Sequence, residues 1–144
     1  MSCSRKRAPA RVRGFSLIEL MVVLAIVAVL TAIAISSYLS YITRSKIRTA
    51  QGDLVALSLN LENVLQRQLA YPSAATSSTT DTQAAFKGWF PAQGKDFSYT
   101  YKPVSGGYLI TAAGIAGNLA QCKLTMDAVG TRSVAGSCGS ITSW

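Results

Sequence analysis

The sequence predicts an α+β protein in which one long N-terminal helix packs against a small antiparallel β-sheet of about four strands. An uncharged, apolar stretch over residues 20–43 and then apolar residues at three- and four-residue steps predict the helix. After residue 97, aromatic and polar residues alternate in short runs separated by glycine-containing turns, which predicts the sheet. With 144 residues, the chain can form one modest domain and an anchor.

The first half of the predicted helix is long and apolar enough to cross a membrane. Between Leu20 and Thr43 the 24 residues include no charge, and a helix of that length reaches about 36 Å, against ~30 Å of bilayer hydrocarbon. Glu19 lies just inside this apolar run. Because a carboxylate near mid-bilayer costs on the order of 2.5–3.5 kcal/mol unless it is paired, Glu19 is a candidate functional residue.

The second half of the helix is amphipathic. Its apolar stripe consists of Ile47, Ala50, Leu54, Leu57, Leu61, Val64, Leu65 and Leu69, while the charged residues Arg44, Lys46, Arg48, Asp53, Glu62 and Arg67 lie mostly off it. We expect this stripe to be the face on which the sheet packs, with Gly52 as its softest point. The helix should end at Tyr71-Pro72, because the residue before proline disfavours the α conformation.

The chain after this helix is expected to begin with a loop over residues 71–96. Its first part, Ser73 to Gln83, is rich in Ser, Thr and Ala and predicts a surface connector. Three aromatic residues follow closely, Phe86, Trp89 and Phe90, and we favour a loop held on the core over an adhesive surface. The strands are expected at residues 97–101, 108–112, 122–126 and 131–134, the first two forming a hairpin around Ser105-Gly106-Gly107.

Most of the net positive charge belongs to the extreme N-terminus. The formal net charge is +8, but Arg5, Lys6, Arg7, Arg11 and Arg13 all precede Gly14, and the rest of the chain has nine basic and six acidic residues. A basic leader before an apolar span keeps the N-terminus cytoplasmic and sends the remainder outward.

The residue inventory argues against catalysis. The chain has no histidine, and its six acidic residues are scattered singly, without a Cys-x-x-Cys or phosphate-binding glycine loop. We therefore predict no catalytic residue, no metal site and no cofactor. Cys3 lies in the leader, whereas Cys122 and Cys138 lie in the exported part, where an oxidising periplasm would allow them to pair.

The stretch Gly14-Phe15-Ser16-Leu17-Ile18-Glu19, between the basic leader and the apolar run, resembles the type III signal sequence of type IV pilins and pseudopilins. The resemblance implies that a prepilin peptidase removes residues 1–14 by cutting between Gly14 and Phe15, and N-methylates Phe15. The resemblance also implies that Glu19 acts in the assembly of subunits into the filament. Residues 15–43 would form the membrane and filament-core half of the helix, and residues 44–144 a periplasmic domain, divided into helix 44–70, loop 71–96 and the sheet and disulfide region 97–144.

The C-terminal region resembles that of PilE-type minor pilins. The resemblance rests on the Phe97–Tyr101 strand, the Gly-Gly turn, and Cys122-Lys-Leu-Thr-Met-Asp with Gly130-Thr-Arg. It implies the type IV pilin fold and a closing disulfide between Cys122 and Cys138. Many pilins have a proline in the apolar helix near the position of Ser36, but this chain has none between Pro9 and Pro72.

Taken together, these resemblances imply a structural, minor subunit of a type IV pilus in a Gram-negative bacterium. It would wait in the inner membrane as a prepilin and move into the cell-surface filament. The expected partners are other pilin subunits, the prepilin peptidase, the inner-membrane assembly platform and the lipid bilayer.

Four alternatives stay open at this point. A type II secretion pseudopilin shares the N-terminal motif, although the cysteine pair and the absence of a C-terminal acidic cluster for calcium favour a pilus. A DNA-binding minor pilin would need a basic patch, and the candidate cations are dispersed in sequence: Lys87, Lys95, Lys102, Lys123 and Arg132. An ordinary secretory signal could be cut after Ala32-Ile33-Ala34, but that cut would sever one long helix. A plain single-pass anchor leaves the rest of the motif unexplained.

Overall fold

The computed structural model describes residues 14–144. Residues 1–13 of the expected leader, which include Cys3, therefore lie outside the described residues. The chain divides into two compact units, Met1–Ser37 and Tyr38–Trp144, which are described separately below.

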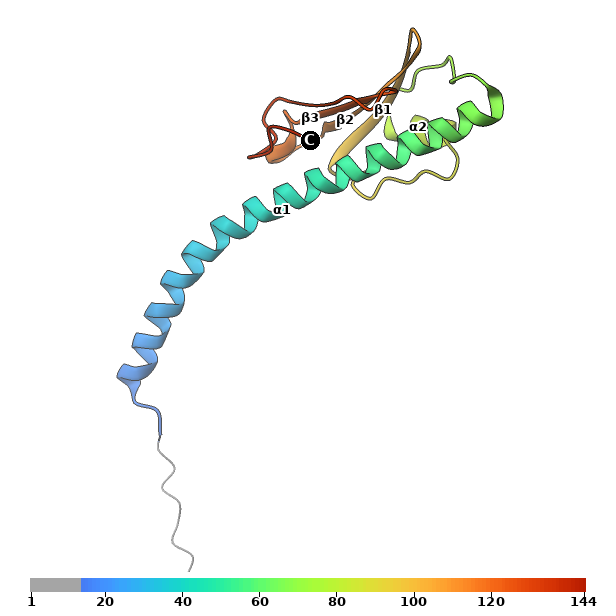
Figure 1. The fold of residues 1–144 in the computed structure, drawn as a ribbon. Coiled ribbons are helices and arrows are strands. Elements are labelled where there is room, and N and C mark those ends of the chain that lie inside the picture. The colour runs from blue at the N-terminus through green and yellow to red at the C-terminus, as the bar shows by residue number, and fades with distance from the viewer. Residues whose placement is uncertain (1–13) are drawn as a thin grey trace, which may run out of the picture. The chain divides into compact units, whose positions relative to one another are not determined.

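Helix α1, Leu17–Gln68, is continuous for 52 residues and contributes to both units (Figure 1). The expected single long helix is thus confirmed, and Gly52 lies within it without a break. The helix ends at Gln68, just before Tyr71-Pro72, as expected. Leu69 adopts a positive φ of 56° while its N–H still bonds the Leu65 carbonyl at 2.7 Å, so the chain leaves the helix in a left-handed conformation before the proline acts.

The four-stranded antiparallel sheet is also confirmed. Its strands are β1 Phe97–Val104, β2 Gly107–Gly114, β3 Lys123–Asp127 and β4 Arg132–Ala135, in the order β1-β2-β3-β4. Val104 pairs with Gly107, which leaves Ser105 and Gly106 as a two-residue turn. Gly106 has a φ of 80°, a conformation that favours glycine in such hairpins. A short 3₁₀ helix, η1 Gly117–Leu119, lies between β2 and β3.

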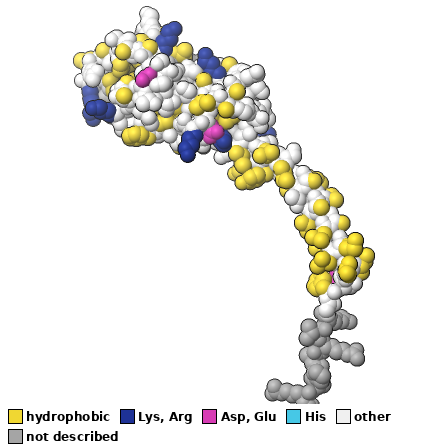
Figure 2. Space-filling view, turned by 180° about the vertical axis from the view of Figure 1, so that it is seen from behind, with side chains coloured by type: hydrophobic (Ala, Val, Ile, Leu, Met, Phe, Trp, Pro, Cys, Tyr) yellow, Lys and Arg dark blue, Asp and Glu magenta, His cyan; other side chains and the backbone are white. Residues whose placement is uncertain are grey.

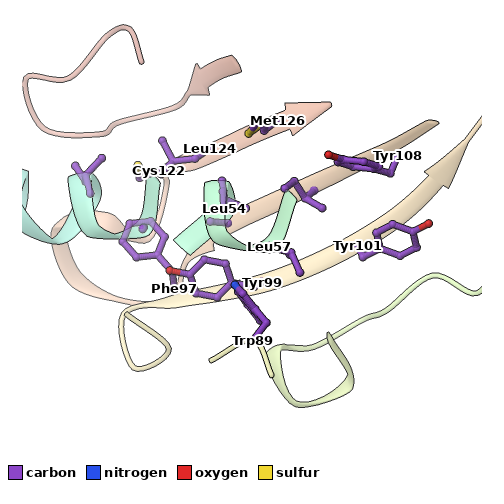
Figure 3. Packing of buried hydrophobic residues seen from close by; sticks show 14 of the residues in the cluster. Leu54, Leu57, Trp89, Phe97, Tyr99, Tyr101, Tyr108, Cys122, Leu124 and Met126 are labelled. Atoms are coloured by element: carbon purple, nitrogen blue, oxygen red, sulfur yellow. The ribbon is translucent and has the colours of Figure 1, made fainter. Parts of the chain in front are cut away.

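The core of the Tyr38–Trp144 unit forms where the sheet packs on the second half of α1 (Figure 3). The helix supplies Ile47, Ala50, Leu54, Leu57 and Leu61, and the sheet supplies chiefly Phe97, Tyr99, Tyr101, Tyr108, Ile110 and Leu124, all fully or nearly fully buried. The expected stripe was too long, because Leu69 is 86% exposed. Burial stops after Leu61, with Val64 and Leu65 only half-buried.

The expected loop over residues 71–96 contains a short helix, α2 Thr79–Ala85, which the sequence analysis did not predict. Ser78 caps it by accepting a hydrogen bond from the Asp81 N–H at 3.1 Å. Helix α2 also protects the outer edge of β1. The Tyr99 N–H donates to the Thr79 hydroxyl at 3.0 Å, and the buried Thr82 hydroxyl lies 2.9 Å from the Tyr99 carbonyl oxygen.

Three tyrosines, Tyr99 and Tyr108 in the core and the partly buried Tyr71, make the stability of this unit sensitive to high pH. Burial, followed by a 2.8 Å hydrogen bond to Glu62, raises the pKa of Tyr71 to about 12. Burial also raises the pKa of Tyr99 and of Tyr108, and both hydroxyls hydrogen-bond a carboxylate, that of Asp53 and of Glu62 respectively. These phenols therefore stay protonated in the folded state at a pH where the unfolded chain loses the protons.

We expect the free energy of unfolding to fall as the pH rises from about 10, the ordinary tyrosine pKa, to about 12. The sign follows because the folded state binds more protons than the unfolded state in this window. Below pH ~10 these tyrosines contribute no slope. Urea unfolding of the full chain in mild detergent across this range measures the effect, and Tyr71→Phe should make the fall shallower. An equal slope in the wild type and Tyr71→Phe would contradict the contribution of Tyr71.

The C-terminal segment is closed by a disulfide between Cys122 and Cys138. Both cysteines are buried, and their Cα atoms lie 4.6 Å apart. The bond joins the start of β3 to the chain beyond β4, so it holds the last strand and the C-terminal residues on the sheet.

Replacing Cys138 with serine should destabilise the folded unit by about 3 kcal/mol, the chain-entropy value for a loop of this length. A parallel fall in the urea midpoint of the wild type after reduction would show that the bond, not the side chain, is responsible. Two free thiols in the untreated, folded wild type would contradict the bridge.

Candidate processing and assembly site

Gly14 and Phe15, the residues expected to flank the cleavage, precede the helix. A Cβ atom added at Gly14 would meet no atom within 4 Å, and Phe15 is 75% exposed. Regular structure begins at Leu17, and the first helical bond in this region runs from the Leu20 N–H to the Ser16 carbonyl at 3.2 Å. The expected cleavage segment is therefore unobstructed by the described part of its own chain.

Glu19 lies in the first turn of α1 and is exposed. The positive end of the helix dipole favours a carboxylate at this position. Within residues 14–144 the one ion pair is Lys46–Asp96, at 2.8 Å, so Glu19 has no cationic partner among the described residues.

The first half of α1 exposes its apolar side chains all round, because every residue from 14 to 41 is exposed. Figure 2 shows these apolar side chains on one face of the segment. Its most apolar 18-residue window has a mean hydropathy of 2.8, and none of that window is buried. Leu17, Ile18, Val29 and Ile33 are each more than 60% exposed. A helix that is apolar on every side needs lipid or neighbouring helices around it.

Asp53 is buried, whereas the sequence analysis expected the charged residues of the helix, Asp53 among them, to lie mostly off the buried stripe. It is only 8% exposed. Its carboxylate accepts hydrogen bonds from the Ala92 N–H at 2.9 Å, the Gln93 N–H at 3.0 Å and the Tyr99 hydroxyl at 2.6 Å. Its spacing could have revealed it, because Asp53 is three residues after buried Ala50 and four before buried Leu57.

The Asp53 contacts fix the aromatic loop on the core. The Trp89 indole N–H donates to the Asp53 carbonyl at 3.0 Å, and both Phe86 and Trp89 are buried. The preferred interpretation, a loop held on the core, is therefore confirmed for these two residues. Phe90 differs, because it is 78% exposed.

A DNA-binding pilin would need Lys and Arg side chains gathered into one basic patch. On the face shown in Figure 2, the Lys and Arg side chains of the globular unit are spread apart. Arg132 packs over the Trp144 ring at 5.4 Å, and Lys46 pairs with Asp96. Within residues 14–144, no three His, Cys, Asp or Glu side chains form a group that could hold a metal ion.

Comparison with known proteins gives a family match at the N-terminal motif. Residues 9–35 match the family described as the prokaryotic N-terminal methylation motif. A fimbrial protein of Pseudomonas aeruginosa is 36% identical over 74 residues, 51% of this chain and 48% of that protein. The type IV major pilin protein PilA of Myxococcus xanthus is 32% identical over 96 residues, 67% of this chain and 40% of that protein.

The matches extend to secretion systems. The type II secretion system core protein G of Pseudomonas aeruginosa is 37% identical over 60 residues, 42% of each chain. The chain spans about half or less of the length of these relatives. No solved structure gave a significant match.

The molecule is thus an α+β protein with a methylation motif at the head of a long, exposed apolar helix and a disulfide-closed sheet on the helix's second half. It carries the prokaryotic N-terminal methylation motif and is similar to fimbrial and type IV pilin proteins.

Proposed function

We propose that the chain is a structural subunit of a type IV pilus. It enters the inner membrane through residues 15–43, with its globular unit in the periplasm. The prepilin peptidase cuts between Gly14 and Phe15 and methylates the Phe15 amine, and the inner-membrane assembly platform moves the subunit into the filament. The observation that carries this proposal is an apolar half-helix exposed all round, with a single carboxylate in its first turn.

The exposed helix explains why the subunit would assemble. Removing about twenty apolar residues from lipid into water is unfavourable, so the helix leaves the bilayer only if other surfaces cover it. Neighbouring pilin helices supply that cover in a filament core. The same surface thus serves as a membrane anchor first and as the assembly contact afterwards.

A glycine substitution tests the processing step. We expect Gly14→Val to leave unprocessed precursor in the membrane and none in sheared filaments, because a branched side chain obstructs approach of the peptidase to the backbone. Gly52→Val is the matched control, since a Cβ at Gly52 also meets no atom within 4 Å. Normal maturation of Gly14→Val, judged by mobility on a denaturing gel, would refute the cleavage site.

The resemblance of residues 122–132 to PilE-type minor pilins supports a minor position in the filament. A minor subunit should be a small fraction of the pilin in sheared filaments. Quantitative mass spectrometry of that material measures the ratio, and an amount equal to the principal pilin would make this chain a major subunit.

A type II secretion pseudopilin is the second candidate, favoured by the match to the core protein G of Pseudomonas aeruginosa. The disulfide-closed C-terminal segment supports the pilus assignment instead. Deleting the gene separates the two: the pilus proposal expects fewer or altered surface filaments with normal protein secretion, and a pseudopilin expects the reverse.

A further inference from the structure

Two arginines of α1 line a hollow at the start of the globular unit. Arg44 and Arg48, one helical turn apart, enclose about 290 Å³ together with Gln51 and residues 140–143. We call this the arginine hollow. The Arg44 Nε donates to the Ser140 hydroxyl at 2.7 Å. Both arginines are exposed and also border a second hollow of about 390 Å³, which includes Tyr41.

The charge of the arginine hollow is not compensated within the described chain. Among residues 14–144 no carboxylate lies within ion-pair distance of Arg44 or Arg48. The opposite wall consists of residues 140–143, which bring the hydroxyls of Ser140, Thr142 and Ser143. That wall is anchored by the Cys138 disulfide and by a 3.0 Å bond from the Ile141 N–H to the Cys138 carbonyl.

Paired guanidinium groups beside hydroxyls suit a phosphate. Each guanidinium presents a planar fork of N–H donors that matches phosphate oxygens, and the charge strengthens each hydrogen bond. The hollow is wide and open at the surface, so a phosphate carried on a larger molecule can reach it.

The position of the hollow along the chain points to a lipid as that molecule. Arg44 is the first charged residue after the uncharged stretch 20–43. Tyr38 and Tyr41, 64% and 69% exposed, come just before it, and tyrosine is enriched where a membrane helix meets the head groups. If α1 spans the bilayer, as the proposed function requires, Arg44 and Arg48 reach the head-group layer of the outer leaflet.

We propose that the arginine hollow binds the phosphate of an anionic phospholipid in the leaflet where the apolar half of α1 ends. The lipid phosphate accepts hydrogen bonds from both guanidinium groups and its single negative charge offsets one of their two positive charges while the subunit waits in the membrane. It also fixes the depth at which the globular unit sits before assembly, so the contact is released when the subunit enters a filament.

The test uses the full chain in detergent with added phosphatidylglycerol or phosphatidylcholine, and counts bound lipid by native mass spectrometry. We expect the wild type to prefer phosphatidylglycerol. The double variant Arg44→Gln/Arg48→Gln should bind it about thirtyfold more weakly, from the attraction of two cations at an anionic surface. Lys102→Gln/Lys123→Gln, which removes two exposed cations of β1 and β3, should bind like the wild type.

Three results would overturn the proposal: no preference for phosphatidylglycerol in the wild type, equal binding by the arginine variant, or an equal loss in the lysine variant. Duplex DNA bound by the wild type but not by the arginine variant, without a lipid preference, would assign the hollow to nucleic acid instead. Membrane insertion and maturation, assayed separately in cells, should be intact in both variants. A wild-type chain that fails to insert would count against the proposed function rather than the lipid site.

Discussion

Replacing Asp53 with alanine is expected to destabilise the globular unit by about 3–5 kcal/mol. The substitution leaves the buried Tyr99 hydroxyl and the part-buried N–H groups of Ala92 and Gln93 without their acceptor. Each buried donor without a partner costs about 1–3 kcal/mol. A small domain has only ~5–15 kcal/mol of stability, so much of the population should unfold under mild conditions.

Asp127 offers a matched control for this prediction. Its carboxylate also accepts two backbone N–H groups, from Val129 at 3.0 Å and Thr131 at 2.7 Å, but at an exposed turn where water replaces it. Asp127→Ala should therefore cost much less than Asp53→Ala. Urea unfolding of the full chain in detergent, followed by tryptophan fluorescence, measures both. Equal losses in the two variants would show that burial of Asp53 does not matter.

Replacing Glu19 with alanine should deplete the subunit in sheared filaments by at least roughly tenfold, because removing one partner of a buried ion pair is strongly unfavourable. We infer that the partner is the methylated, still protonated amine of Phe15 on a neighbouring subunit. That amine becomes available only after cleavage. In a helix bundle without lipid or water, this ion pair can form, and so stabilise the filament, only when the subunit lies at the correct axial register.

The Glu19 variant must be separated from a processing defect. We expect Glu19→Ala to be cleaved after Gly14 and to remain in the inner membrane at the wild-type amount. Thr31→Ala is the control within the same half-helix, because the Thr31 hydroxyl bonds only the Val27 carbonyl of its own helix, at 2.7 Å. Wild-type levels of Glu19→Ala in purified filaments would disprove the docking role, and uncleaved precursor would place Glu19 in peptidase recognition.

The parts of the fold that follow from simple periodicity could be predicted from sequence. Helix α1 and the β1–β2 hairpin have long, regular patterns, and Ser105-Gly106 marks the turn between the strands. Helix α2 could not be read in this way. It has seven residues with little apolar character, and Thr82 is buried through contacts to Ser78 and Tyr99 that exist only after the chain has folded.

The residues of the candidate sites also differ in whether the sequence alone could place them. Gly14, Phe15 and Glu19 form one contiguous motif, so their placement needed no tertiary structure. Asp53 was misplaced because a charged residue is ordinarily assigned to the solvent face, whereas here three donors from distant residues satisfy it. The arginine hollow unites residues of α1 with residues 140–143, a proximity that only the folded chain creates.

The mass of the mature protein's N-terminal peptide tests the central claim most directly. We expect a chain that begins at Phe15 and carries one methyl group on its amine. A chain that begins at Ile35 would show an ordinary secretory signal, and an intact N-terminus at Met1 or Ser2 would show a plain anchor. Either result would contradict processing as a prepilin.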